Sequence, residues 1–278
     1  MNKPFFTILF VLFFCFISEA QKPEKVKGNK NVTVIQTEIN PFHTIIVDED
    51  FDIEIIYNTV PSVTIETDEN LHEFIKFNVS NGVLSFDKTA KITSKKRLNI
   101  TVNYDDSLNN IKTTDSGEIL SLTTMDLENA ILITEGSSKA GLTIKTTNFE
   151  FQSNGKSKVK LNLTCENAKL SLTDNSKIDA LIYAPVTNID LYQHASANIE
   201  GETNEFGLRT DNSSGFNGKN FTATTCNTLN EMSSDAFIEV TDTVTIDASG
   251  TSSVYLYGEP KIIINKLRGT SKLQKKEK

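Results

Sequence analysis

A polar segment centred on a serine recurs roughly every 19 residues in the second half of the chain, and a short fixed period of this kind constrains the fold most. Between successive segments, short runs alternate apolar and polar residues, as in Val159, Leu161 and Leu163. Alternation with period two is the pattern of a half-buried strand. One repeat of about 19 residues is therefore predicted to hold a strand, a polar turn, a second strand and a second turn. The aligned serines are Ser138, Ser157, Ser176, Ser196, Ser214, Ser234, Ser253 and Ser271.

A unit this short cannot bury its apolar face alone, so successive units are expected to stack as the coils of a solenoid. Helical repeats are excluded because the apolar period is two, and propeller blades because they need about 40 residues each. An antiparallel sandwich of hairpins remains an alternative, since turns about every 8–12 residues would also suit it. Every second turn is alike while the intervening turns differ, which favours an all-β, single-chain parallel β-helix. Equivalent Asn and Thr side chains should then stack and hydrogen-bond between coils.

The N-terminus has the order of a secretory signal peptide. Lys3 precedes an apolar run that continues to Ile17, and small residues stand at −3 and −1 of a cleavage site before Gln21. The run is too short to span a bilayer. Cys15 lacks the small residues that precede a bacterial lipidation site, so we expect cleavage and export. No later apolar segment approaches the length of a membrane span, so no integral membrane segment is predicted.

The remaining chain divides into a charged leader over 21–41, a β-helix domain over 42–273 and a basic tail over 274–278. A short helix is predicted from Asp68, as its cap, to Ile75. It is followed by a hairpin whose strands, 75–79 and 83–86, flank Asn81-Gly82, a strong signal for a two-residue turn.

Composition excludes several classes of function. With 28 Lys and Arg against 36 Asp and Glu, the net charge of −8 argues against nucleic acid as a partner. Three Cys are too few for a disulfide scaffold. Cys165 and Cys226 occupy equivalent places in the repeat, about three coils apart, which separates their backbones by about 14 Å at about 4.8 Å per coil. A disulfide needs Cα atoms within about 7 Å, so both thiols are predicted to be free.

Carboxylates recur at or beside the serine-centred turns, where a stacked ladder of them could bind Ca²⁺. Asn154 and His194 interrupt that ladder, and the calcium β-roll motif G-G-x-G-x-D is absent. Ordinary turn chemistry, in which Asp and Asn bond their own backbone, is the favoured interpretation, and His194 is expected to be a solvated turn residue. No catalytic, cofactor-binding or metal-binding residue is therefore predicted. The carboxylates concerned are Asp115, Glu135, Asp174, Asp211 and Asp235.

Parallel β-helices also serve as polysaccharide lyases and hydrolases, whose sites need paired carboxylates, or Asp with Lys or Arg, on one face. The strand faces carry Lys158, Lys160 and Lys169 beside Thr and Asn, without a paired carboxylate nearby, so an enzyme is not predicted. An aromatic-lined groove would favour glycan binding, but the candidate side chains are equally suited to the core. They are Phe149, Phe151, Phe206, Phe216 and Phe221.

The chain resembles the bacterial family of the auto-transporter adhesin head, the GIN domain, over about residues 42–273. The resemblance is carried by F-x-T-I-I-V-x-x-x-F-D-I-x-I (42–55), V-T-I-E-T-D-E-N-L (63–71), N-G-V-L-S-F (81–86) and L-N-I-T-V-N-Y (98–104), and at the end by S-V-Y-L-Y-G-E-P-K-I (253–262) and R-G-T-S-K-L (268–273). It implies a parallel β-helix exported from a bacterium, with adhesion as its role, and it brings no functional residues with it.

The expected function is an exported binding protein that is adhesin-like and presents a side face of the solenoid at the cell surface, outside the cell or in the periplasm. The expected partner is a cell-surface protein, a matrix protein or a glycan, and no cofactor is expected. Two alternatives stay open at this point: a polysaccharide lyase or hydrolase on the same scaffold, and a purely structural envelope protein.

Overall fold

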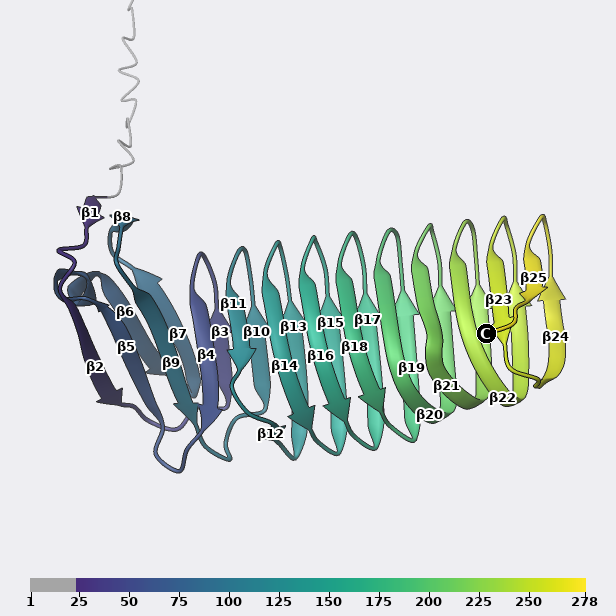
Figure 1. Ribbon diagram of the computed structural model, residues 1–278, viewed down its shortest axis with the longest axis horizontal. Coiled ribbons are helices and arrows are strands. Elements are labelled where there is room, and N and C mark those ends of the chain that lie inside the picture. Colours follow the sequence, from purple (N-terminus) through teal and green to yellow (C-terminus); the bar gives the residue numbers. More distant parts are fainter. Residues whose placement is uncertain (1–23) are drawn as a thin grey trace, which may run out of the picture.

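The computed structural model of the chain describes residues 24–278, which form a β-solenoid of about nine turns (Figure 1). Strands of successive coils pair in parallel: Lys139 is the partner of Lys158, and Lys158 is the partner of Lys177. The parallel β-helix and the predicted length of its coils are thus confirmed, and the antiparallel sandwich is excluded for the body of the molecule. The predicted signal peptide, its cleavage site before Gln21 and Cys15 lie outside the described residues.

Each coil contributes one strand to each of two faces, here named face A and face B. Face A contains β4 (Asp52–Tyr57), β11 (Glu118–Ser121), β12 (Met125–Asp126), β14 (Lys139–Lys145), β16 (Lys158–Thr164), β18 (Lys177–Tyr183), β23 (Ser253–Tyr257) and β25 (Lys272–Lys275). Face B contains β3 (Thr44–Val47), β10 (Asn110–Thr113), β13 (Asn129–Thr134), β15 (Asn148–Ser153), β17 (Asn167–Leu172), β19 (Val186–Leu191) and β24 (Lys261–Leu267). Three long strands turn the corner and contribute to both faces: β20 (Ser196–Thr210), β21 (Gly215–Asn230) and β22 (Asp235–Ala248).

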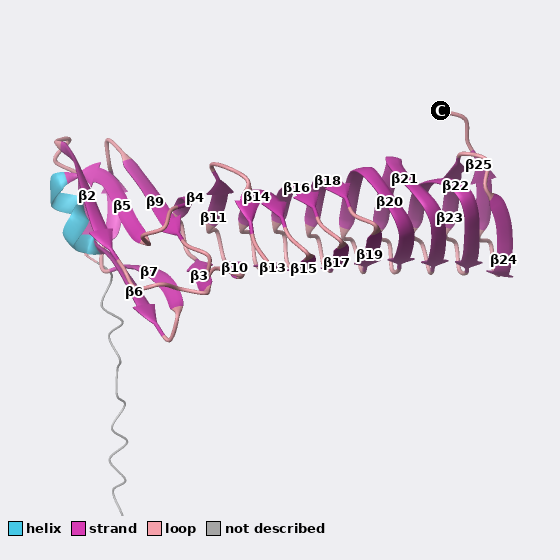
Figure 2. Cartoon of the chain, turned by 90° about the horizontal axis from the view of Figure 1, so that it is seen from below, coloured by secondary structure: helices cyan, strands magenta, loops and turns pink. Residues whose placement is uncertain are grey.

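A separate group of elements covers the N-terminal end of the first coil (Figure 2). Face A continues there through the parallel pairing of β4 with β9, which joins an antiparallel set, and face B continues through β7, which belongs to a hairpin. A short 3-10 helix, η1, lies between β5 and β6. The elements are β1 (Lys25–Lys27), β2 (Val32–Glu38), β5 (Ser62–Asp68), η1 (Glu69–Phe74), β6 (Ile75–Ser80), β7 (Val83–Lys88), β8 (Lys91–Ser94) and β9 (Leu98–Tyr104).

The local predictions for this region hold in part. The hairpin is confirmed, and its turn residues Asn81 and Gly82 both have positive φ, as a type I′ turn requires. The helix forms where predicted, but Asp68 does not cap it. The buried carboxylate of Asp68 instead accepts hydrogen bonds from the backbone N–H groups of Lys30 and Lys96, each at 3.2 Å.

The folded domain is longer than the predicted β-helix segment. Strands β1 and β2 lie within the expected leader of 21–41, and β2 pairs with β5 along its whole length. At the other end, β25 includes residues 274 and 275 of the expected basic tail. Residues 25–38 therefore belong to the fold.

The core is one continuous column of inward-facing side chains along the solenoid axis. In β16 every second residue is buried, and Val159, Leu161 and Leu163 are each 2% exposed. Burying one such side chain contributes roughly 1.5–3 kcal/mol, so the alternation seen in the sequence is the main source of stability.

The serine-centred turns also place a small buried residue at the coil edge. The buried serines include Ser157 and Ser176, each 0% exposed. Two positions of the sequence alignment were wrong by one residue: Ser196 is the partner of Lys177, so Ala195 holds the buried place in that coil, and Ser253 is the partner of Asp235, so Ser252 does. The methyl side chain of alanine fits this buried place as well as the hydroxymethyl side chain of serine does. In both coils a serine directly follows the buried residue, and that serine was aligned instead.

Polar ladders between coils are present, as predicted. The Thr134 hydroxyl lies 2.8 Å from that of Ser153 in the next coil, and both are buried. On face B the side-chain amide of Asn148 donates to the Asn129 side-chain carbonyl at 2.8 Å, and Asn167 donates to Asn148 at 3.1 Å. These bonds tie each coil to the next at positions where a simple apolar contact would not fix the register.

Candidate ligand-binding surface

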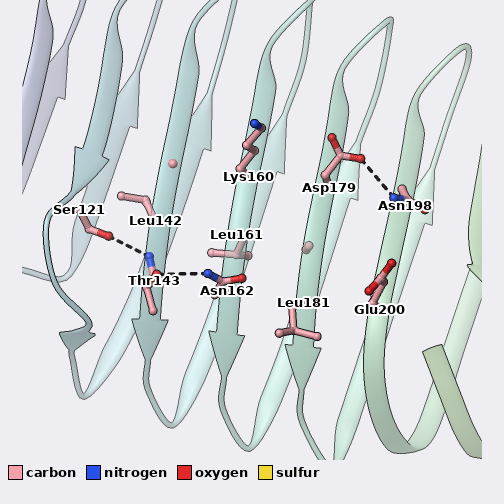
Figure 3. Close-up of a pocket in the computed structure, with 12 residues that line it drawn as sticks. Ser121, Leu142, Thr143, Lys160, Leu161, Asn162, Asp179, Leu181, Asn198 and Glu200 are labelled. Carbon is pink, nitrogen blue, oxygen red and sulfur yellow. Dashed lines mark hydrogen bonds between the residues drawn. The ribbon is translucent and has the colours of Figure 1, made fainter. Parts of the chain in front are cut away.

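A groove of about 440 Å³ crosses face A from β11 to β20 (Figure 3). Gly141 lies in a row of outward-facing positions that continues from coil to coil as Lys160, Asp179 and Asn198. Gly141 carries no side chain, and the side chain of Leu120 on the neighbouring strand lies over it, with Cδ2 2.6 Å from the place that a Cβ would take. The groove therefore runs along the solenoid axis and is open to solvent on its outer side.

Hydrogen bonds between coils orient several side chains that line the groove. The Thr143 backbone N–H donates to the Ser121 hydroxyl at 2.9 Å, and the Asn162 side-chain amide donates to the Thr143 hydroxyl at 3.4 Å. Further along, the Asn198 amide donates to the Asp179 carboxylate at 3.4 Å (Figure 3). The result is a row of amide, hydroxyl and carboxylate groups held at the spacing of the strands.

The groove brings together charged residues that sequence reasoning kept apart. Lys160 was expected to lack a nearby carboxylate, but its partner on the neighbouring strand is Asp179, and Glu200 lines the same groove. On face B, Lys169 is likewise the partner of Glu150. Such neighbours are separated by a whole coil in the sequence, so only the coil register reveals them. Within residues 24–278, Lys160 forms no ion pair.

Exposed apolar side chains lie on the same face. In β18 the inward positions carry the buried residues, yet outward-facing Leu181 and Tyr183 are 36% and 43% exposed. The sequence carried a signal for this feature, because apolar residues stand at both phases of the alternation in this strand. The phenylalanines considered for an aromatic groove are all buried in the core instead: Phe149, Phe151, Phe206, Phe216 and Phe221.

Face B has a second groove, of about 540 Å³, over Gly207. Two cations line it, Lys169 and Arg209, and Arg209 forms ion pairs with Glu231 at 3.4 Å and Asp211 at 3.8 Å. This groove also contains Asn188 and Asn227, so it resembles the groove of face A in its polar groups.

The carboxylates considered for Ca²⁺ do not form one ladder. Asp115 and Asp174 occupy the positive-φ turn position, whereas Glu135 and Asp211 each precede that position and Asp235 begins a strand. Contrary to the prediction, two of them interact with a neighbouring coil instead of staying within one turn: Glu135 pairs with Lys112 at 2.8 Å, and Asp174 accepts a hydrogen bond from the backbone N–H of Gly155. Among the described residues, no group of three or more His, Cys, Asp or Glu side chains could hold a metal ion. His194 is an exposed turn residue.

Cys165 and Cys226 are free and buried, as predicted. Burial, with a smaller contribution from Glu166, raises the pKa of the Cys165 thiol to about 12, and burial raises the pKa of Cys226 further. The register argument was wrong in detail: Cys226 is the partner of Phe206, whose column leads back to Ala168, three residues beyond Cys165. The two thiols are therefore separated both along the axis and around the coil.

Comparisons with solved structures show the same fold. The chain is similar to a putative adhesin from Parabacteroides merdae, with 16% identity and a TM-score of 0.64 over 91% of this chain and 99% of that one. It is also similar to a putative adhesin from Parabacteroides distasonis, with 17% identity and a TM-score of 0.63 over 91% and 100%. A putative lipid binding protein from the same species has 15% identity and a TM-score of 0.62 over 91% and 100%.

No curated protein matches the chain. A family model does match it, over residues 41–183 and 162–260, and that model is described as "Putative auto-transporter adhesin, head GIN domain". The two matches overlap and together cover most of the chain. The chain therefore belongs to the GIN-domain family of auto-transporter adhesin heads.

Proposed function

We propose that the protein is an exported, adhesin-like binding protein that holds a glycan of a cell surface or matrix along face A. The observation that carries the proposal is the open groove that crosses five successive coils and is lined by amide, hydroxyl and carboxylate groups. The names of the family and of its structural neighbours point in the same direction, towards adhesion. Within residues 24–278 there is no helix long and apolar enough to cross a membrane.

A glycan suits this surface in both chemistry and shape. Side-chain amides and hydroxyls such as those of Asn162, Asn198 and Thr143 can donate to and accept from sugar hydroxyls. The exposed side chains of Leu181 and Tyr183 offer apolar contact to the C–H face of a sugar ring. An open groove parallel to the axis accommodates a linear polymer, whereas a small ligand is normally enclosed in a pocket.

A glycan array probed with residues 21–278 tests the proposal. The Asn162→Ala/Asn198→Ala variant removes two amides from the face A groove, and Asn188→Ala/Asn227→Ala removes two from face B as the matched control. We expect binding to a defined set of glycans, lost in the first variant and kept in the second. Absence of binding to any glycan, or equal binding by both variants, would contradict the proposal.

A polysaccharide-cleaving enzyme is the second candidate, because Lys160, Asp179 and Glu200 share one groove. Acid–base cleavage needs such groups on one face. The adhesin proposal predicts that a bound polysaccharide keeps its chain length during prolonged incubation. Shortening by the native protein that is lost in Asp179→Asn would instead favour the enzyme.

A further inference from the structure

Three lysines stand side by side at the start of neighbouring face A strands. Lys139, Lys158 and Lys177 are direct partners in β14, β16 and β18, and all three are exposed. We name them the lysine column. Neighbouring strands lie about 4.8 Å apart, so the column spans about 10 Å along the axis. Like charges directly opposite each other on adjacent strands destabilise a sheet, so this arrangement has a cost in the free protein.

Little in the structure neutralises the column. Lys139 pairs with Glu118 at 2.9 Å, but Lys158 and Lys177 form no ion pair in the part of the chain that the structure describes. Residues 136–178 contain seven lysines against three carboxylates, in a chain whose net charge is −8. The column is therefore part of a positive region on an acidic protein.

The column lies beside the face A groove. Lys160 lines the groove two residues beyond Lys158 on the same side of β16, and Lys156 precedes Lys158 in the turn. The nearest carboxylate of the groove is that of Asp179, which accepts a hydrogen bond from Asn198. A polymer lying in the groove would thus meet ammonium groups along one border and hydrogen-bonding groups along its length.

We propose that the lysine column binds the carboxylates of an acidic polysaccharide whose chain runs parallel to the solenoid axis. The inference rests on the proposed glycan-binding function and names the class of glycan. A polyuronate carries one carboxylate on each sugar, and the column offers one ammonium group on each of three successive coils. Binding relieves the repulsion between Lys158 and Lys177, because a carboxylate of the ligand beside each ammonium group offsets the like charge of the neighbouring lysine.

A polysaccharide fits the surface better than a nucleic acid does. The positive region is confined to a few coils of an acidic protein. Domains that bind nucleic acid usually combine a basic patch with a positive net charge. The groove beside the column supplies amides and hydroxyls for sugar hydroxyls. A DNA oligomer therefore serves as a comparison ligand in the test.

The test measures equilibrium binding of residues 21–278 to polygalacturonate, to neutral dextran and to a DNA oligomer, at low and at physiological salt. The Lys158→Gln/Lys177→Gln variant removes two charges from the column, and Lys76→Gln/Lys91→Gln removes two exposed charges from the N-terminal elements. Two exposed ionic contacts of up to about 1 kcal/mol each correspond to a loss of affinity on the order of tenfold.

We expect that loss for polygalacturonate in the first variant, a weaker salt dependence, and unchanged affinity in the second. The thermal midpoint of Lys158→Gln/Lys177→Gln should equal or exceed that of the native protein, because the substitutions remove a like-charge contact. Unchanged affinity of this variant for polygalacturonate, or binding of the DNA oligomer as tight as that of polygalacturonate, would overturn the inference. The proposed function would still stand in that case if the protein bound glycans on the array. Absence of binding to every glycan would remove the proposed function itself.

Discussion

Proline at position 176 should disturb the protein only locally. Ser176 is buried in the turn before β18, where its backbone N–H donates to the Thr173 carbonyl at 3.3 Å and its hydroxyl donates to the same carbonyl at 2.7 Å. Proline removes both donors. Each lost hydrogen bond costs about 1 kcal/mol, and a carbonyl left unsatisfied costs about 1–3 kcal/mol. Ser176→Pro should therefore destabilise this turn by about 3–5 kcal/mol.

The effect should stay near the substitution because each coil pairs mainly with its neighbours. A local destabilisation of this size accelerates amide hydrogen exchange on the order of 1,000-fold where the coil opens. Mass spectrometry of exchanged peptides should show this acceleration within residues 155–200. Peptides from residues 40–70 should exchange at the native rate.

Ser176→Ala is the matched control, because alanine keeps the backbone N–H and removes only the hydroxyl. Its expected cost is about 1 kcal/mol, so exchange in the same peptides should rise only about fivefold. A similar loss of protection along the whole chain in Ser176→Pro would refute the reasoning, since it would mean that the molecule opens as one cooperative unit.

Three further predictions concern other parts of the chain. Gly201→Ala should lower the free energy of unfolding in urea by about 2–4 kcal/mol, because Gly201 has φ +112° and a Cβ there would collide with a backbone carbonyl. Gly215→Ala is the control: its Cβ would meet open space, so its free energy of unfolding should stay within about 0.5 kcal/mol of the native value. Stability should fall as the pH rises above 9, because unfolded thiols ionise near their ordinary pKa of 9.0 while Cys165, with a pKa of about 12, and Cys226 stay protonated in the folded state. Cys165→Ala/Cys226→Val should flatten that decline, and an unchanged slope would contradict it. Intact-mass measurement of exported protein should show Gln21 as the first residue, and retention of residue 1 would contradict export by cleavage.

Local and periodic signals in the sequence predicted much of the fold. The Asn81-Gly82 turn specifies its hairpin through two adjacent residues. The solenoid follows from the alternation within strands and from the regular return of the serine-centred turns. The alternation and the serine-centred turns arise from interactions that every coil repeats, so a single chain shows the same pattern many times.

Features that depend on one distant pairing were missed. Strand β2 pairs with β5, which follows it in the chain only after β3 and β4, and most of its side chains are exposed, so it lacks the alternation that marks a buried strand. Its lysine-rich surroundings suggested a leader instead. The register errors at Ser196 and Ser253 arose because each of these serines directly follows the residue that holds the buried place in its coil. The error at Cys226 amounts to three residues and became apparent only from the strand partners of Phe206.

The candidate site could be predicted only in its general chemistry. The exposed Asn and Thr residues of the strands were visible, but the lining of the groove depends on which residues of successive coils lie side by side, such as Lys160 and Asp179. The lysine column likewise consists of residues that lie one coil apart in the sequence. That these lysines are neighbours can be recognised only when the register between coils is known with single-residue accuracy.

Lysine acetylation footprinting of the complex with a glycan selected on the array tests the central claim that face A holds the ligand. Binding along face A predicts slower acetylation of Lys158, Lys160 and Lys177, with unchanged rates at Lys169 and Lys266 on face B, as read by mass spectrometry. Protection of Lys169 and Lys266 instead, or no protection at any lysine of face A, would contradict it.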